Sequence, residues 1–189
     1  MSDPETLAVQ LIEVDVATRA TLLEPYRIAD HASAQALALA LKQAYDETFS
    51  HDLVLAAQAS ATLTDLAALT ADATVQGLAA WTAGLVALDE GRLADAVAQL
   101  DRAEAIFQAT GQTERTVAVQ IGKMAPLAMQ GHFDAAFSAG LAARAASTAQ
   151  GDLLTAGKIE QNLGNLDFMR QRYRAALPRF QRCPEREYY

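Results

Sequence analysis

Gly91-Arg92-Leu93-Ala94-Asp95-Ala96 returns forty residues later as Gly131-His132-Phe133-Asp134-Ala135-Ala136. The same register gives Gln-Arg-Tyr-Arg-Ala-Ala at 171–176, one period downstream, and a weaker match at 50–56, one period upstream. A glycine followed at once by an apolar pattern of helical spacing is typical of the turn in a helical hairpin. Four such turns at one period predict a repeat protein.

The composition favours packed helices over a sheet. Of the 189 residues, 51% are hydrophobic and 6% are aromatic, and much of the apolar fraction is alanine. Alanine is the strongest helix former and lets helices approach closely. We therefore expect an all-α protein, a right-handed α-solenoid of antiparallel helix hairpins.

Several classes of partner and compartment are disfavoured by the same composition. A net charge of −8 without a basic face argues against nucleic acid. No apolar run approaches the roughly 18 residues that span a bilayer, and the N-terminal residues lack the zones of a signal peptide. The single cysteine, Cys183, cannot form an internal disulfide. The sequence thus predicts a cytoplasmic protein without a nucleic-acid or membrane partner.

The charge is distributed unevenly along the chain. Residues 1–90 carry three basic and thirteen acidic side chains, whereas residues 91–189 carry twelve and ten. Two differently solvated surfaces explain this difference most simply. The alternative is head-to-tail attraction between copies, which would make the protein a homo-oligomer and a self-associating structural element.

Apolar spacing divides the chain after residue 30 into four units. The units are 31–70, 71–110, 111–150 and an incomplete 151–189. Each is expected to hold two helices, and these are expected at 31–49, 53–70, 72–88, 93–110, 113–130, 133–149, 153–170 and from 173 onward. Among their buried positions we expect Leu53 and Trp81. Pro126 predicts a local kink, and Pro178 predicts an interruption of the last helix.

Residues 1–30 lie outside the register and are expected to form a helical cap. Residues 6–14 predict one short helix, and Asp15 is a candidate N-cap for a second, 16–24, which Pro25 ends. Terminal units of a solenoid are atypical because one face lacks a neighbouring repeat. The opposite end shows no comparable cap, so we expect the native polypeptide to continue beyond Tyr189.

Residues 31–182 resemble an array of tetratricopeptide repeats, of the longer type found in bacterial arrays. The resemblance is carried by Asn162-Leu163-Gly164-Asn165, followed by Gln171, Tyr173, Ala176 and Phe180. In that family a small residue stands where the two helices of a hairpin cross, a role that Gly84 and Gly164 fit and Met124 does not. A second small residue stands where the second helix meets the next unit, as Ala96, Ala136 and Ala176 do here.

The resemblance implies binding of a protein or peptide in a groove lined by the first helix of each hairpin. At forty-residue steps, the candidate partner-binding residues are Trp81, Leu85, Asp89, Ile121, Ala125, Met129, Lys158, Gln161, Asn162, Asn165 and Met169. An asparagine amide suits this role because it donates to and accepts from a peptide backbone. Where the family's carboxylate clamp needs lysine, this chain has Trp81, Ile121 and Gln161, which favours an apolar or amphipathic ligand.

Each candidate has a purely structural alternative. Asn162 and Asn165 are equally suited to an inter-helix hydrogen bond. Trp81 is more often a core residue than an interface anchor, although tryptophan is enriched among binding hot spots. Met129 and Met169 are more often gap fillers than a binding wall.

Catalysis, metal binding and cofactor binding find little support in the sequence. The histidines, His31, His51 and His132, are far apart and have no metal-ligand spacing. Cys183 has no partner that would activate a nucleophile, and no glycine-rich phosphate loop is present. The arginines between 170 and 186 form a basic cluster, which we interpret as a solvated face or a docking surface for a further unit, with an acidic or phosphorylated ligand as the alternative.

We therefore expect a non-enzymatic scaffold that binds proteins or peptides. The alternative is a sensor or regulatory segment of a larger signalling protein. Residues 15–23 resemble the leader of repeat arrays that precede a caspase-like (CHAT) domain, and this resemblance implies a protease downstream.

Overall fold

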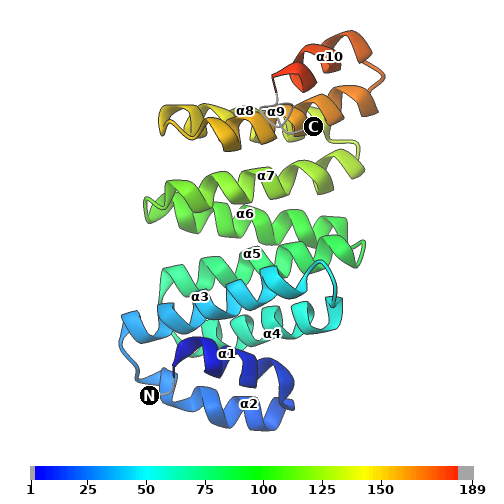
Figure 1. Ribbon diagram of the computed structural model, residues 1–189. Coiled ribbons are helices and arrows are strands. Elements are labelled where there is room, and N and C mark those ends of the chain that lie inside the picture. Colours follow the sequence, from blue (N-terminus) through cyan, green and yellow to red (C-terminus); the bar gives the residue numbers. More distant parts are fainter. Residues whose placement is uncertain (1–2, 183–189) are drawn as a thin grey trace. The chain divides into compact units, whose positions relative to one another are not determined.

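The computed structural model describes residues 3–182, and every regular element within them is helical (Figure 1). The chain forms two compact units, Met1–Thr110 and Gly111–Tyr189. The first contains α1 (Pro4–Glu13), α2 (Val16–Leu23), the 3₁₀ turn η1 (Glu24–Arg27), α3 (His31–Thr48), α4 (Leu53–Leu69), α5 (Ala73–Asp89) and α6 (Leu93–Ala109). The second contains α7 (Thr113–Met129), α8 (Phe133–Ala149), α9 (Leu153–Met169) and α10 (Tyr173–Gln181).

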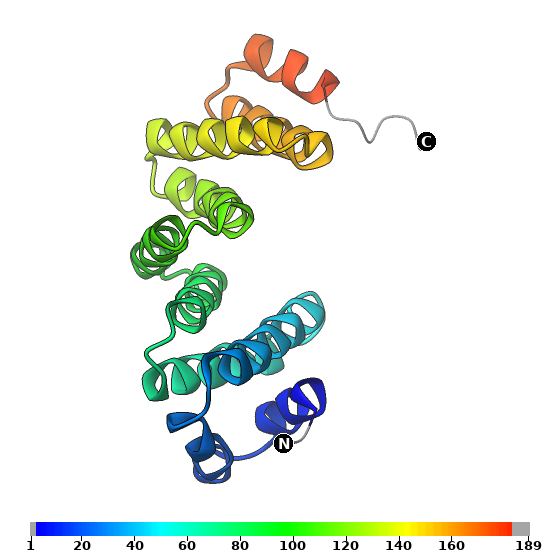
Figure 2. The same cartoon turned by 90° about the vertical axis from the view of Figure 1, so that its left-hand side faces the viewer.

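Within each unit, consecutive helices from α3 onward pack as antiparallel pairs (Figures 1 and 2). The second helices α4, α6, α8 and α10 begin forty residues apart, and so do the first helices α5, α7 and α9. The all-α hairpin architecture and the helix boundaries predicted from the sequence are confirmed to within a few residues.

The glycine turns explain why the boundaries recur. Gly91 has φ +74°, and the N–H of Arg92 donates to the carbonyl of Ala87 at 2.8 Å, which closes a left-handed helix cap. Gly111, Gly131 and Gly151 have φ between +69° and +81°. The turn between α9 and α10 keeps this geometry with Gln171 at φ +58°, although a residue with a side chain is strained there.

We expect Gln171→Gly to raise the free energy of unfolding by about 0.5–1 kcal/mol, because relief of left-handed strain exceeds the added entropy of the unfolded chain. The reverse change at the equivalent turn, Gly131→Gln, is expected to lower it by a similar amount. Urea unfolding of both variants measures the two effects, and a destabilised Gln171→Gly protein would contradict the assignment.

Aspartate caps fix the helix starts in the first unit. Asp15 accepts from the N–H groups of Ala17 and Thr18 at 2.9 and 3.0 Å, as expected for the N-cap of α2. Asp3 likewise caps α1, which therefore begins at Pro4, two residues earlier than predicted. Helix α2 ends at Leu23 and runs into η1. Both α1 and α2 contact α4, and α1 also contacts α3, so residues 3–27 cover one side of that hairpin.

Two sequence expectations require correction. Pro178 does not interrupt the last helix, because α10 runs continuously from Tyr173 to Gln181. Proline removes one hydrogen bond there, and the packing of α10 on α9 is sufficient to keep the helix. Leu53, expected in the buried stripe of α4, is 58% exposed, because it stands in the first turn of that helix, directly after the loop. In α7, Pro126 is buried and the helix continues through it to Met129.

The three hairpins α5–α6, α7–α8 and α9–α10 each have one glycine opposite one large side chain at the point where the two helices cross. A Cβ added at Gly84 would lie 2.7 Å from Leu100 Cγ, and one added at Gly164 would lie 2.7 Å from Phe180 Cε1. In the intervening hairpin the order is reversed. A Cβ at Gly140 on the second helix would lie 2.7 Å from Cε of Met124 on the first. Met124 therefore stands where the first helices of the other two hairpins have glycine.

This difference predicts unequal tolerance to alanine. Gly164→Ala is expected to lower the free energy of unfolding by about 1–3 kcal/mol, because the rigid ring of Phe180 must move. Gly140→Ala is expected to cost less, because the facing atoms are the ends of flexible Met124 and Leu163 side chains. Urea unfolding of the two variants tests the comparison, and equal losses would contradict it.

Candidate functional site

Trp81 on α5 is held by the packing of the first unit. Its ring meets that of Phe107 edge to face, with 6.3 Å between centroids and 83° between planes. The ammonium of Lys42 lies 4.3 Å from the centre of the Trp81 ring. Phe107 is fully buried over Gly77, where an added Cβ would lie 2.5 Å from the phenylalanine ring. Trp81 is thus half-buried and takes part in both the core and the surface of its hairpin.

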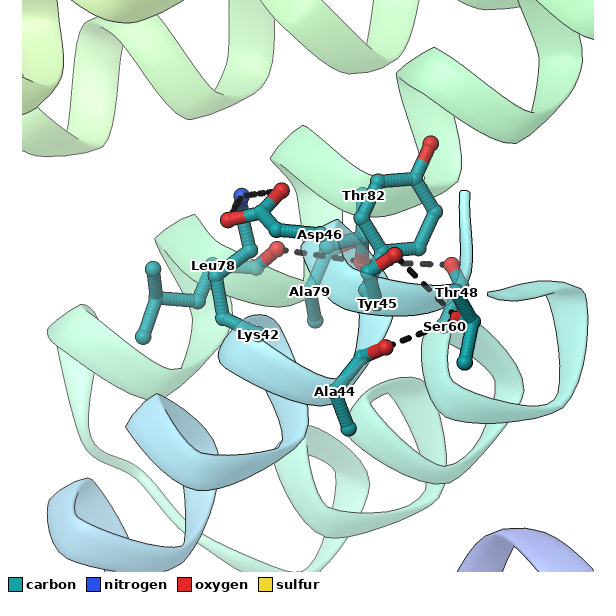
Figure 3. Close-up of polar contacts among 9 residues, drawn as sticks. All are labelled: Lys42, Ala44, Tyr45, Asp46, Thr48, Ser60, Leu78, Ala79 and Thr82. Carbon is teal, nitrogen blue, oxygen red and sulfur yellow. Dashed lines mark hydrogen bonds and ion pairs between the residues drawn. The ribbon is translucent and has the colours of Figure 1, made fainter. Parts of the chain in front are cut away.

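Lys42 itself is 8% exposed and is anchored on α3. Figure 3 shows its ammonium on the carboxylate of Asp46, and the ring of Tyr45 lies 5.5 Å from the same nitrogen. Figure 3 also shows Ser60 donating to Thr82 at 3.1 Å, which ties α4 to α5. The pKa of the Tyr45 hydroxyl is raised, mainly because the residue is buried and to a smaller extent because of the negative charges of Asp89 and Asp46. One face of Trp81 is therefore already occupied by a cation of its own chain.

The other two candidates of the first unit are not grouped with Trp81. Asp89 borders a hollow of about 460 Å³ between α4 and α5, whose walls include Leu53, Val54 and Val86. The pKa of the Asp89 carboxyl is raised, mainly because the residue is partly buried and to a smaller extent because of the negative charge of Glu90. Leu85 is half-buried on α5.

In the second unit the structure brings all eight candidates into one groove between α7 and α9. The larger part, which we call the Ser147 hollow, has a volume of about 720 Å³ and is lined by Glu114, Val117, Ala118, Ile121, Ser147, Gln150, Asp152, Thr155, Lys158, Gln161 and Asn162. The smaller part, the methionine end, has about 210 Å³ and is lined by Ile121, Met124, Ala125, Ala128, Met129, Asn162, Asn165, Leu166 and Met169. Ile121 and Asn162 line both parts, so the two parts adjoin along the α7–α9 groove.

The Ser147 hollow exists because this hairpin lacks the aromatic pair of the preceding one. Val117, Ile121 and Ser147 stand one period after Gly77, Trp81 and Phe107. The later set contains about half as many side-chain heavy atoms, so a volume that is filled in the α5–α6 hairpin is open here.

Polar groups without an internal partner face this groove. The side-chain amides of Asn162 and Asn165 make no hydrogen bond within residues 3–182, so neither forms the inter-helix bond considered as their alternative role. The hydroxyl of Ser147 is buried, with the residue 1% exposed, and likewise has no partner among the described residues. A buried hydroxyl of this kind destabilises the folded chain until something bonds to it.

Charge is concentrated at the hollow. Glu114 and Asp152 line it together with one cation, Lys158. Asp152 caps α9, and hydrogen bonds from the hydroxyl and N–H of Thr155 hold the pKa of Asp152 below its ordinary value, with a smaller contribution from Lys158. Asp152 is therefore ionised at neutral pH.

The methionine end is apolar and open. Met129 and Met169 are 59% and 52% exposed, so neither fills a gap in the core, in contrast to what the sequence favoured. Met124 does fill one, opposite Gly140. Exposed, unbranched thioether side chains adapt to varied apolar surfaces.

The opposite face of α9 is fixed by buried ion pairs. Glu160 and Asp167 are 6% and 3% exposed. Arg179 of α10 donates to both carboxylates, at 3.0 and 2.9 Å, and Arg144 of α8 donates to Glu160. Burial opposes ionisation of Glu160, but the hydrogen bonds and charges of the two arginines outweigh it and hold the pKa of Glu160 below its ordinary value of 4.5. This network orients the groove face of α9.

Glu160→Gln is expected to lower the free energy of unfolding at pH 7 by roughly 2 kcal/mol, less than for a fully buried pair because Arg144 is partly exposed. A carboxyl with a lowered pKa contributes stability above its unfolded-state pKa and loses it in acid. The wild type should therefore lose stability below about pH 4.5 more steeply than the variant. Urea unfolding between pH 3 and 7 measures this, and parallel profiles would contradict it.

Some of the remaining sequence candidates have local partners. His31 lies 2.9 Å from the carboxylate of Asp72, whereas His132 stands at the N-cap position of α8 without a side-chain cap bond. Within the basic cluster, Arg170 bonds to Asp134 at 2.9 Å, while Arg182 lies 3.8 Å from Glu160. Cys183 and Arg186 lie outside the described residues.

Neither a metal centre nor a membrane span is evident between residues 3 and 182. In this range no group of three His, Cys, Asp or Glu side chains is placed to hold a metal ion. None of the helices described there is both long and apolar enough to cross a bilayer.

Comparison of the chain with protein-family models, with curated proteins and with solved structures found no match. Its function is therefore inferred from the geometry of the α7–α9 groove.

Sequence reasoning missed Glu114, Ser147 and Asp152. Glu114 and Asp152 lie at the N-terminal ends of α7 and α9, and Ser147 lies on the second helix α8. The resemblance pointed instead to the middle and C-terminal parts of the first helices. The replacement of Phe107 by Ser147 one period later was the signal that could have found them, because it exchanges a large core side chain for a small polar one.

Proposed function

We propose that this chain is a non-enzymatic scaffold that binds a protein or peptide segment in the α7–α9 groove, as tetratricopeptide-like repeats do. The observation that supports it is the convergence of unpartnered amides, exposed methionines and an open hollow on one face of one helix pair. Within residues 3–182, the amides of Asn162 and Asn165 make no hydrogen bond to another helix, and the side chains of Met129 and Met169 are not part of the core.

The dimensions of the groove favour an extended peptide. Its lining runs from Glu114 to Met129 on α7, a length of about 22 Å at 1.5 Å per helical residue. An extended chain covers that length with roughly six or seven residues. Asn162 and Asn165 lie near its middle, where their amides can bond to the peptide backbone.

The segment is apolar or amphipathic. At the methionine end, Ala125, Met129, Leu166 and Met169 offer an apolar wall. Burial of one or two leucine-sized side chains there contributes roughly 1.5–3 kcal/mol each before the entropy of ordering is subtracted. Binding is therefore expected in the micromolar range, which suits a reversible scaffold.

Selection from a displayed random heptapeptide library, followed by fluorescence anisotropy with the selected peptides, tests this function. Asn162→Ala combined with Asn165→Ala is expected to weaken binding about tenfold, because two hydrogen bonds to the peptide backbone are lost. Gln10→Ala, at an exposed position of α1, is the matched control and should leave the affinity unchanged.

Circular dichroism must first show equal helicity for the three proteins. Selection of no peptide, or selection of peptides whose affinity is insensitive to the two asparagines and to Met129→Ala, would contradict binding in this groove. The regulatory-segment alternative would then gain weight.

A further inference from the structure

The Ser147 hollow is lined by both apolar and polar groups. Its apolar wall is Val117 and Ile121, its rim carries the carboxylates of Glu114 and Asp152, and the hydroxyl of Ser147 lies buried in its lining without a partner among residues 3–182. A wall of hydrocarbon that ends in carboxylates complements a long side chain with an apolar stem and a charged end.

Electrostatics select the sign of that charge. Two carboxylates and one ammonium line the hollow, and Lys158 already interacts with Asp152. Glu114, which is exposed at the rim, adds a second negative charge. An entering anion would be repelled by these carboxylates, whereas a cation would be attracted by them.

The buried hydroxyl provides a second and independent indication. Ser147 can accept a hydrogen bond through either lone pair, and an ammonium or guanidinium is a donor with several N–H groups. A leucine or phenylalanine in the hollow would leave this buried hydroxyl unpaired. A donor is therefore preferred over a purely apolar group of the same size.

We propose that the Ser147 hollow is a specificity pocket for one arginine or lysine side chain of the bound segment. The inference rests on the proposed peptide-binding function and specifies its ligand, an extended segment with apolar side chains over the methionine end and one cationic side chain in the hollow. The stem lies along Val117 and Ile121, and the charged end bonds to Glu114, Asp152 and Ser147.

Defined synthetic peptides test this pocket directly. The probes are fluorescein-labelled heptapeptides, Leu-Ala-Leu-Ala-Ser-Gly-X and the reversed sequence, acetylated and amidated so that only X carries charge. X is arginine, lysine, citrulline, glutamate or phenylalanine. In at least one direction, arginine is expected to bind about tenfold more tightly than citrulline, its neutral counterpart, and glutamate is expected to bind least.

Two variants connect this preference to the hollow. Glu114→Gln should reduce the ratio of arginine to citrulline affinity several-fold, whereas Glu13→Gln, the same change at an exposed position of α1, should not. Ser147→Ala should weaken the arginine peptide several-fold while the protein unfolds at an equal or higher urea concentration, because a buried unpaired hydroxyl is removed. A merely structural Ser147 would instead lose stability.

Refilling the hollow gives a third test. Val117→Gly with Ser147→Phe recreates the Gly77 and Phe107 pair of the preceding hairpin, in which the ring lies over glycine. This double variant should lose the arginine preference and keep binding through the methionine end. Persistence of the preference would overturn the assignment of the pocket.

The outcomes separate the two proposals. If citrulline or phenylalanine binds as tightly as arginine, and Asn162→Ala still weakens binding, the cation pocket is wrong and groove binding stands. If no probe binds up to 1 mM, and library selection yields no peptide that depends on the two asparagines, both proposals fail.

Discussion

The hairpins from α5 onward depend on a steric constraint at the point where their two helices cross. One of the facing positions must be glycine, because the other side chain occupies the space of its Cβ: Leu100 over Gly84, Met124 under Gly140 and Phe180 over Gly164. The glycine can stand on either helix of the hairpin, but the two facing positions cannot both carry a large side chain. The turn glycines set where the helices end, and α5 to α9 have 17 residues each.

Positions away from the crossing are free to change, and the candidate site arises from such a change. Phe107 and Trp81 fill the end of one hairpin with two rings. One period later, Ser147 and Ile121 occupy those positions and leave a hollow without any alteration of helix length or turn. A repeat can thus acquire a pocket by exchanging side chains on a backbone that the crossing glycine and the turn glycines already hold.

The same distinction explains what the sequence could predict. Helix ends depend on local chemistry, the glycine turns and the aspartate caps, so their positions were predicted well. Exposure depends on neighbours that are distant in the chain, which is why Leu53 and Met129 were assigned to the wrong environment. The eight groove positions of the second unit were implied by the family resemblance together with the repeat spacing. The acidic rim at Glu114 and Asp152 was not, because it is formed where two different helices begin.

Helix α9 shows how one element serves both stability and recognition. On one face, Glu160 and Asp167 are buried and fully engaged by arginines of α8 and α10. On the groove face, the amides of Asn162 and Asn165 have no partner within residues 3–182. Polar groups that contributed only to folding would be paired, as the first set is, because an unpaired group near the surface adds nothing to stability. The contrast between the two faces therefore supports a role in binding for the groove face, with the ion pairs holding it in position.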